Sequence, residues 1–363
     1  MLHATVDSVR AQIAAILAAW GAPPHLAETT AEVMAETDLM GVDSHGIAML
    51  TMYEEMHRAG VLRLAGEPFL RRDYAAIALV DGADGLGHPA AMMAMKLAIE
   101  KARAFGIGAV GVVNSHHFGA AGCYARMAAA AGLMGLVAST ARGVILVPTR
   151  AAEPVLGTNP IAFAAPLPGA PPMVLDMATT TVAANKVKAY HLREKDLPPG
   201  WVVDGAGRPV TAHAEAMEFV FRRREGGITP LGGGEETGGH KGYGLALMVQ
   251  MLAGALVGGS FSALRARTAR AGQPHNIGHL MIALDPRAFR DLADYEADAA
   301  ATLALLRETP PADPALPVLA PGDPEEAARA ERLSGGIPIP EALERQIREI
   351  AARAGAPFLL RAA

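Results

Sequence analysis

The order of elements around one glycine pattern constrains the fold of this chain most. Gly106, Gly108 and Gly111 spell G-x-G-x-x-G, which in a Rossmann unit follows a strand and begins a helix, so that a pyrophosphate meets the helix N-terminus. Here a helical pattern, Pro89 to Phe105, precedes the glycines, and a strand-like run, Ile107 to Val113, follows. The acidic residue expected about 20 positions further on is also missing. We therefore predict that the glycines are packing residues and that a Rossmann site is absent.

The other hydrophobic patterns alternate between helix and strand and predict an α/β fold. Amphipathic spacing predicts early helices over Val6 to Trp20, Leu26 to Leu39 and Ile47 to His57. The other predicted strands are Ala76 to Val80, Leu133 to Ser139, Ile161 to Ala165, Met173 to Met177 and Ile277 to Leu284. The later predicted helices are Gly119 to Ala131, Thr180 to Tyr190, Tyr243 to Leu256, Pro324 to Leu333 and Pro340 to Ala354. This mixture is too irregular for a doubly wound sheet.

Composition excludes several classes of partner. Charged residues make up 19% of the chain, the net charge is −5, and the densest cationic run is only Arg222 to Arg224, so nucleic acid is not expected. The single cysteine, Cys123, rules out an internal disulfide and suits a reducing cytoplasm. The longest apolar stretch, Gly244 to Gly259, is too short to span a bilayer, and the N-terminus has no secretory pattern. We expect a soluble, cytoplasmic protein.

The twelve histidines do not predict a metal site. His116 and His117 are adjacent, so in an extended segment they point to opposite sides and do not readily share one ion. No H-x-x-x-H pair lies on a convincing helix, and no tight carboxylate group accompanies the histidines. Metal catalysis is therefore not expected.

Small and polar residues gather in four segments at junctions between predicted elements. Each segment alone is typical of a capped turn, because Asp and Ser cap helices and glycine closes turns. The segments are Asp43-Ser44-His45-Gly46, Asn114-Ser115-His116-His117-Phe118-Gly119, Leu175-Asp176-Met177-Ala178-Thr179 and Gly239-His240-Lys241-Gly242-Tyr243-Gly244.

In this order and spacing, the four segments resemble the type-2 malate/L-lactate dehydrogenase family. That family also includes ureidoglycolate and sulfolactate dehydrogenases, diketogulonate reductase and piperideine-carboxylate reductase. The resemblance covers nearly the whole chain. Further matching pieces are Gly157 to Phe163, Leu245 to Met248, Gly278-His279, Asp285-Pro286 and Gly336 to Pro338.

The resemblance implies a homodimer with a non-Rossmann nicotinamide-binding fold and a mixed, largely antiparallel central sheet. Residues 1–75 would form a helical N-terminal region that packs with the C-terminal helices of residues 324–363. Residues 76–323 would form the nicotinamide-binding and catalytic domain. The implied reaction transfers a hydride between NAD or NADP, with NAD slightly favoured, and a carbonyl or imine carbon beside a carboxylate.

That reaction needs a proton partner, and histidine titrates in the useful range. By the resemblance, His45 and His117 are the candidate acid/base residues, and Ser44 could bind the substrate or relay a proton. Tyr53 lies two turns after His45 on the same helix face and matches a substrate-contacting tyrosine. Lys186 matches a lysine near the substrate site, although a solvated helix lysine is an equal interpretation.

The cofactor residues are implied in the same way. Gly119 would begin a helix whose N-terminal amides receive negative charge. His117 would lie near the nicotinamide, and Lys241 would supply a cation, because its charge at a helix start opposes the helix dipole unless an anion binds there. The remaining cofactor-site residues are Leu175, Asp176 and Met177, together with Gly322 and Asp323 in a late adenosine-side loop.

The chain departs from the family at positions near the substrate. Met49 replaces the arginine that grips the substrate carboxylate, Met40 replaces a second arginine, and Ala141-Arg142 stands where Asn-Ser is usual. Either the substrate lacks a carboxylate there and packs apolar surface on the methionines, or another cation, with Arg142 the best candidate, takes the carboxylate. Methionine at both positions favours the first account.

Three functions therefore stay open: a dehydrogenase of a small 2-hydroxy or 2-oxo acid, an NADPH-dependent reductase of a cyclic imino acid, and a catalytically impaired cofactor-binding homologue. Retention of His45, His117 and Tyr53 argues against the third.

Overall fold

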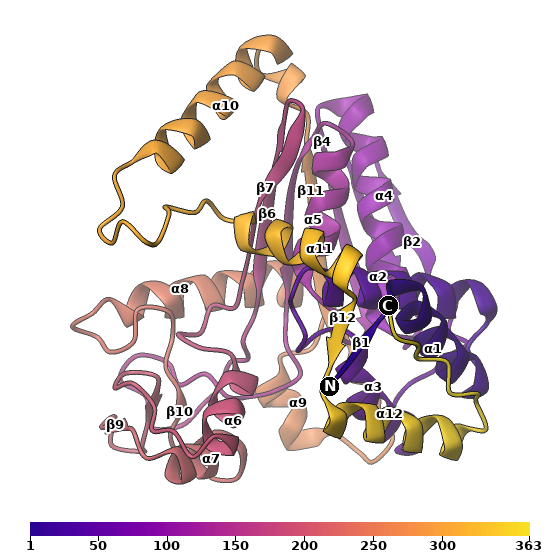
Figure 1. Cartoon of the computed structure of the whole chain (residues 1–363), viewed down its shortest axis with the longest axis vertical. Helices are drawn as coiled ribbons and strands as arrows, with labels where there is room; N and C mark the ends of the chain where they lie inside the picture. Colours follow the sequence, from indigo (N-terminus) through magenta and orange to yellow (C-terminus); the bar gives the residue numbers. More distant parts are fainter.

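A seven-stranded mixed sheet lies at the centre of the structure, a computed structural model that describes residues 1–363 (Figure 1). Only β3 and β4 run parallel, and the other five pairings are antiparallel. In sheet order the strands are β2 (Phe69–Tyr74), β3 (Ile77–Asp81), β4 (Ile107–Ser115), β11 (Ile277–Leu284), β5 (Met134–Ser139), β6 (Ile161–Leu167) and β7 (Ala170–Met177). The predicted α/β class and the mixed, largely antiparallel sheet are thus confirmed.

Helices cover both faces of this sheet. α4 (Gly87–Phe105) and α5 (Ala121–Ala130) pack on one face, and α8 (Gly239–Val249) continues into a π-helical segment, η2 (Gln250–Ala255), on the other. The buried faces of α4 and α5 are largely alanine, which lets the helix backbones lie close to the strands.

The G-x-G-x-x-G glycines are packing residues, as predicted. Gly106 ends α4 with φ of 80°, and Gly108 and Gly111 lie inside β4. A Cβ added at Gly108 would lie 2.1 Å from the Ala98 carbonyl oxygen, and one at Gly111 would lie 2.6 Å from Val257. α4 does connect the parallel strands β3 and β4, so one β-α-β unit is present.

Protein fills the position where a Rossmann unit would hold a pyrophosphate. At the N-terminus of α4, a Cβ on Gly87 would lie 2.4 Å from the His116 carbonyl oxygen. The Gly87 amide donates to the His117 carbonyl oxygen over 2.9 Å. The first turn of α4 is therefore closed by the segment that follows β4.

A second core joins the two ends of the chain. Its buried residues come from positions 4–86 and 337–360, and β1 pairs antiparallel with β12 (Figure 1). The elements are β1 (Leu2–Ala4), α1 (Val6–Ala19), α2 (Pro24–Leu39), η1 (Ile47–Met49), α3 (Leu50–Arg58), α11 (Asp323–Gly335), β12 (Ile337–Ile339) and α12 (Glu341–Ala354). A domain boundary at residue 75 stays a prediction, since β2 lies before that boundary and pairs in the central sheet.

Several elements escaped the sequence patterns. All six residues of β2 are exposed, so the strand shows no hydrophobic alternation. α10 buries only Leu303 and projects away from the rest of the chain (Figure 1). α10 spans Leu292–Glu308. The others are β1, β12, β8 (Val202–Val203), β9 (Pro209–Val210), α7 (His213–Phe221), β10 (Gly227–Ile228), α9 (Ser262–Thr268) and η3 (Pro286–Ala288). α6 (Ala184–Leu192) starts four residues later than predicted. No helix is both long and apolar enough to cross a bilayer.

Candidate active site

A cleft of about 440 Å³ brings together residues from both cores. His45 and Met49 enter it from the segment before α3, His117 from the end of β4, and Asp176 from β7. Arg142, in the loop after β5, is one of the charged residues of the wall. The volume is typical of a site for a small molecule.

A buried carboxylate in α2 holds the turn that carries His45. Asp38 Oδ2 accepts a hydrogen bond from the Ile47 amide over 2.8 Å. A Cβ at Gly46 would lie 1.8 Å from Asp38 Oδ1, so only glycine fits between the turn and α2. Burial raises the pKa of Asp38 to about 8. Arg332 of α11 donates to the Asp38 carbonyl oxygen over 2.6 Å and pairs with Asp43, which ties the turn to the C-terminal helices.

Tyr53 fixes the ring of His117. The hydroxyl oxygen of Tyr53, which is fully buried, lies 2.7 Å from His117 Nδ1. Nδ1 is therefore occupied, and Nε2 is the ring nitrogen left for a substrate. Burial lowers the pKa of His117 well below its usual range, and the nearby His45, His88, His279 and Arg142 lower it further. A neutral imidazole near pH 7 is suited to accept a proton.

His45 is the second histidine of the cleft. Its ring centroid lies 5.4 Å from that of His117, and its Nδ1 is 2.8 Å from Ser44 Oγ. Burial also lowers the pKa of His45. Both rings are close enough to contact one small substrate.

His116 and His117 turn to different partners, as their adjacency predicted. His116 is fully buried, and its Nδ1 lies 3.2 Å from Nδ1 of His275. His279 lies 2.8 Å from Ser139 and 3.0 Å from Ser115, and its ring stacks on Phe118. These histidines support the wall behind His117.

At the other end of the cleft, the N-terminus of α5 faces an acidic residue. The Gly122 amide donates to Asp176 Oδ2 over 2.7 Å. Asp176 is open to the cleft, yet the protein around it raises the pKa of its carboxyl group to about 6, with Glu325 adding to the effect. Val174, two residues before Asp176 in β7, donates its amide hydrogen to the Pro321 carbonyl oxygen. The loop that contains Gly322 therefore lies against this end of the cleft.

This end fits a nucleotide. Gly119 and Gly122 put no side chain between the first turn of α5 and the cleft, and helix N-terminal amides favour anionic groups. A carboxylate such as Asp176 is the acceptor that ribose hydroxyls need.

A family model described as malate/L-lactate dehydrogenase matches residues 4–348 of this chain. The chain belongs to the malate/L-lactate dehydrogenase family. The resemblance of the four polar segments is thereby confirmed.

Individual members of the family align over almost the full length. The malate dehydrogenase of Pyrococcus horikoshii is 36% identical over 350 residues, 96% of this chain and 94% of that protein. The (2R)-3-sulfolactate dehydrogenase (NADP(+)) of Chromohalobacter salexigens is 33% identical and covers 93% of this chain and 94% of that protein. The crystal structure of malate dehydrogenase from Entamoeba histolytica matches with a TM-score of 0.92 and 28% identity, over 98% of each chain.

Membership of the malate/L-lactate dehydrogenase family makes this chain an oxidoreductase that acts on CH–OH groups. Dehydrogenases of the family use a nicotinamide cofactor.

The structure gathers only part of the predicted site. The predicted residues that line the cleft are Ser44, His45, Met49, His117, Gly119, Asp176 and Met177. Tyr53 lies behind His117 and not at the cleft surface, so in this structure it acts through that histidine.

The remaining predicted residues lie outside the cleft wall, and these are Leu175, Lys186, Lys241, Gly322 and Asp323. Lys186 is exposed, with its ammonium 5.3 Å from the Trp201 ring centroid, as the solvated-lysine interpretation expected. Asp323 accepts hydrogen bonds from Arg307 and the Ala320 amide, which hold its carboxylate in place and lower its pKa.

Sequence reasoning missed Asp38, His275 and Glu325. Asp38 is a charged residue on the otherwise apolar face of α2, which could have signalled a buried role. His275 lies just before β11 and Glu325 lies in the first turn of α11, so only the tertiary fold brings them to the cleft.

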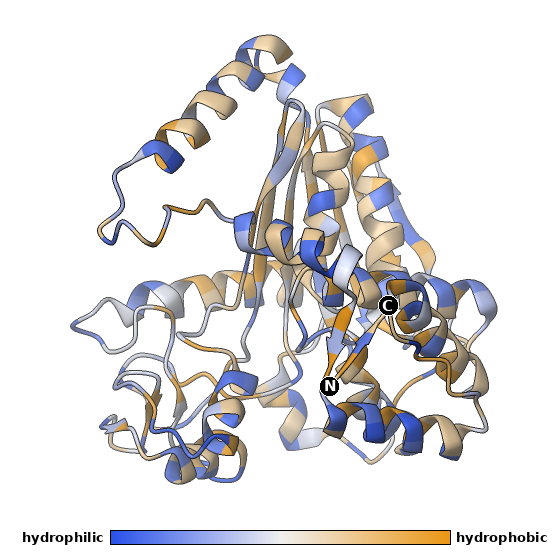
Figure 2. Cartoon of the chain, viewed as in Figure 1, coloured by the Kyte–Doolittle hydropathy of each residue, from blue (hydrophilic) through white to orange (hydrophobic).

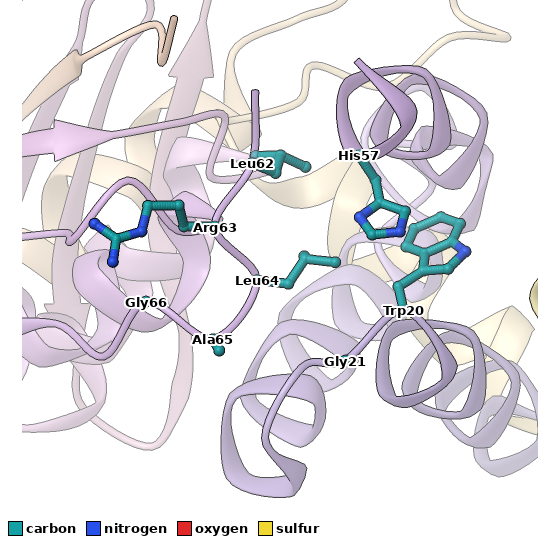
Figure 3. A pocket seen from close by; sticks show the side chains of 8 residues that line it. All are labelled: Trp20, Gly21, His57, Leu62, Arg63, Leu64, Ala65 and Gly66. Atoms are coloured by element: carbon teal, nitrogen blue, oxygen red, sulfur yellow. The ribbon is translucent and has the colours of Figure 1, made fainter. Parts of the chain in front are cut away.

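A second hollow, of about 340 Å³, opens between α1 and α3 (Figure 3). Trp20 and His57 stack there with ring centroids 5.4 Å apart, and Leu62 and Leu64 line the opposite side. None of the predicted site residues lies in this hollow.

Proposed function

We propose that this protein is an NAD(P)-dependent dehydrogenase of a small 2-hydroxy or 2-oxo acid, with His117 as the acid/base. The observation that carries the proposal is the neutral, Tyr53-oriented imidazole of His117 beside His45, in one cleft with the glycine-lined N-terminus of α5.

In the oxidation direction, the substrate loses a hydride from C2 and a proton from its hydroxyl group, leaving a 2-oxo acid. A nicotinamide cofactor held at the α5 end of the cleft would supply the acceptor for that hydride. In the tautomer whose Nδ1–H donates to the Tyr53 hydroxyl oxygen, the free Nε2 of His117 takes the proton. Burial lowers the pKa of this ring, so it is neutral before the reaction. In the reduction direction, the same nitrogen returns the proton to the new alkoxide oxygen. Ser44 holds His45 beside the substrate oxygen.

We further propose that NAD is preferred over NADP. The α5 end of the cleft holds the carboxylates of Asp176 and Glu325. A ribose hydroxyl would donate to Asp176, whereas a 2′-phosphate would meet negative charge there. Asp176→Ser should therefore reduce the preference for NADH over NADPH, so that the dissociation constants of the two cofactors become more similar. An NADPH preference in the unmodified protein would contradict this assignment.

The assembly we propose is a homodimer. Leu247, Met248, Met251 and Leu256 along α8 and η2 are 37–68% exposed, and the apolar colour follows α8 in Figure 2. Leu305 and Leu306 of the projecting α10 are exposed as well. Light scattering coupled to gel filtration should give twice the 37.6 kDa chain mass.

The function is tested by titrating the purified protein with NADH and NADPH, then screening 2-oxo acids and cyclic imines for nicotinamide oxidation. Saturable NADH binding with turnover of a 2-oxo acid is expected. Turnover of cyclic imines alone would favour an imine reductase, and nucleotide binding without any turnover would favour a catalytically impaired homologue.

A further inference from the structure

Two arginines near the cleft have no acidic partner. Arg142 lines the cleft, and its only side-chain hydrogen bond runs from Nη2 to Met52 Sδ over 3.4 Å. Arg265 of α9 has a buried Nε without any hydrogen-bond partner. Arg265 is half-buried, and a guanidinium nitrogen left there without an acceptor is costly unless an anion completes it. Arg142 is exposed, so its guanidinium is open to an anion in the cleft.

The fold holds these arginines together. The Ser262 hydroxyl donates to the Ala141 carbonyl oxygen over 2.6 Å, which fixes the start of α9 against the loop of Arg142. The neighbouring Thr140 exchanges two hydrogen bonds with Gly278 of β11, over 3.0 and 3.1 Å. The Arg142 loop is therefore anchored from two sides.

The titratable groups next to the arginines are histidines and not carboxylates. His275 lines the cleft, and His116 lies behind it. Burial, together with the nearby His116, Arg265 and Arg142, lowers the pKa of His275 to about 3. Burial and the charge of Arg142 lower the pKa of Arg265. No carboxylate is among the charges that act on either group, so the positive charge here is uncompensated.

The opposite wall offers an anionic substrate no cation. Met40, Met49, Met52 and Met56 line the cleft on the side of α2 and α3. A 2-hydroxy acid carries its carboxylate on the carbon that reacts, so the anchor must lie near His117. Arg142 meets this need, since it lines the same cleft as His117 and its guanidinium contacts Met52 of α3.

We propose that Arg142, reinforced by Arg265, binds the carboxylate beside the reacting carbon of the substrate. The methionine wall then packs against the apolar remainder of the molecule. This inference rests on the proposed function and specifies its substrate class as a 2-hydroxy or 2-oxo acid with a free carboxylate and an apolar side chain. It replaces the expectation that the substrate lacks a carboxylate at this place.

The test compares Arg142→Gln and Arg265→Gln with Arg267→Gln, an exposed arginine on the same helix as Arg265. The substrates are the best 2-oxo acid of the wild-type screen and its uncharged 2-oxo amide. Arg142→Gln should raise KM for the acid by roughly 10–100-fold and leave KM for the amide nearly unchanged, because a hydrogen bond between charged groups is lost only with the acid. Arg265→Gln should act in the same direction but less, and Arg267→Gln should behave like wild type.

Met49→Arg provides a second arm. Met49 and Met52 lie three residues apart, so an arginine at 49 can reach the same anion. In the Arg142→Gln background, Met49→Arg should restore much of the lost affinity for the acid, whereas in the wild-type background it should add little. A gain in the wild-type background together with no effect of Arg142→Gln would overturn the inference.

Direct NADH titration of each variant separates the remaining outcomes. Unchanged NADH affinity in all three glutamine variants is expected. A loss of NADH affinity in Arg142→Gln or Arg265→Gln, with KM for the acid unchanged, would show that the arginines bind the cofactor and would refute the proposal. If the wild type turns over no 2-oxo acid at all, the proposed function itself is wrong. That result comes from the wild type alone, so it is distinct from a failure of the arginine proposal, which appears only in the glutamine variants.

Discussion

His117 is held by a neighbour that does not line the cleft. The buried hydroxyl of Tyr53 occupies Nδ1 of His117 and fixes both the ring plane and the nitrogen that faces the cleft. The sequence placed Tyr53 two turns from His45 and predicted a substrate contact, but helix periodicity gives only the face and not what lies opposite. His117, which lies opposite Tyr53, follows β4 and is 64 residues from Tyr53 along the chain.

Tyr53→Phe should lower kcat by about 10-fold while the affinity for NADH stays the same, because one hydrogen bond that orients the base is lost. The rate–pH profile of kcat should shift as well, since the hydrogen-bond partner of the titrating ring has changed. A purely structural role for Tyr53 would instead lower the melting temperature and leave the profile in place. An unchanged kcat and profile would rule out the positioning role.

His88 makes stability depend on pH. It is fully buried, neither ring nitrogen has a hydrogen-bond partner, and burial lowers its pKa to about 3. The unfolded chain therefore binds a proton at His88 below about pH 6.5 that the folded chain does not, so this residue destabilises the fold as the pH falls below that value.

His88→Gln should remove this contribution. The difference in unfolding free energy between about pH 7.5 and pH 5.5 should shrink by about 1.4 kcal/mol relative to wild type, measured by urea unfolding at both values. Other groups titrate in the same window, so only the difference between the two proteins is informative. An identical difference in both would mean that His88 is protonated in the folded state.

At the scale of elements, helices pack against the central sheet where small residues let the helix and strand backbones lie close together. A Cβ at Gly278 of β11 would lie 1.8 Å from the Ala253 carbonyl oxygen in η2. The glycines at this contact and the alanines of α4 and α5 thus set the distance between the layers. The many alanines of the sequence do not predict this layer spacing, because composition alone does not say which alanines face a strand.

Gly278→Ala should destabilise the fold by about 1–3 kcal/mol or more, since the added methyl group overpacks the contact between β11 and η2. Gly244→Ala is the matched control, because Gly244 lies in α8 with no atom near its added Cβ. The control should be slightly more stable than wild type, by roughly 0.5–1 kcal/mol, owing to better helix propensity. Equal stability of the two variants in thermal unfolding would contradict this packing.

Most long strands and helices with a buried face were predictable, although α7, which buries Ala216, Phe219 and Val220, was missed. β3, β4, β5, β6, β7 and β11 match apolar runs in the sequence. β2 is exposed throughout, and α10 buries a single leucine, so neither has a pattern to detect. The missed segments become helical through contacts with tertiary neighbours. α10 has few such contacts within the chain, because it buries only Leu303.

At the scale of the whole molecule, the fold joins two cores whose boundary is the cleft. The N-terminal core supplies His45 and Met49, and the sheet core supplies His117 and Asp176. The sequence identified both histidines and Asp176, because they lie in local motifs. It could not decide between the two accounts of Met49, since the position of Arg265 and His275 next to Arg142 is a property of the complete fold.

The central claim is that His117 moves the proton in a nicotinamide-dependent hydride transfer. Its most direct test is the turnover of the best 2-oxo acid by wild type, His117→Ala and His45→Ala, with NADH affinity measured in parallel. The account predicts a loss of about 10²–10⁴-fold in kcat for His117→Ala, with NADH affinity and folding retained, and a smaller loss for His45→Ala. Near-wild-type kcat in His117→Ala would contradict it, and if His45→Ala alone lost activity, the proton carrier would be His45.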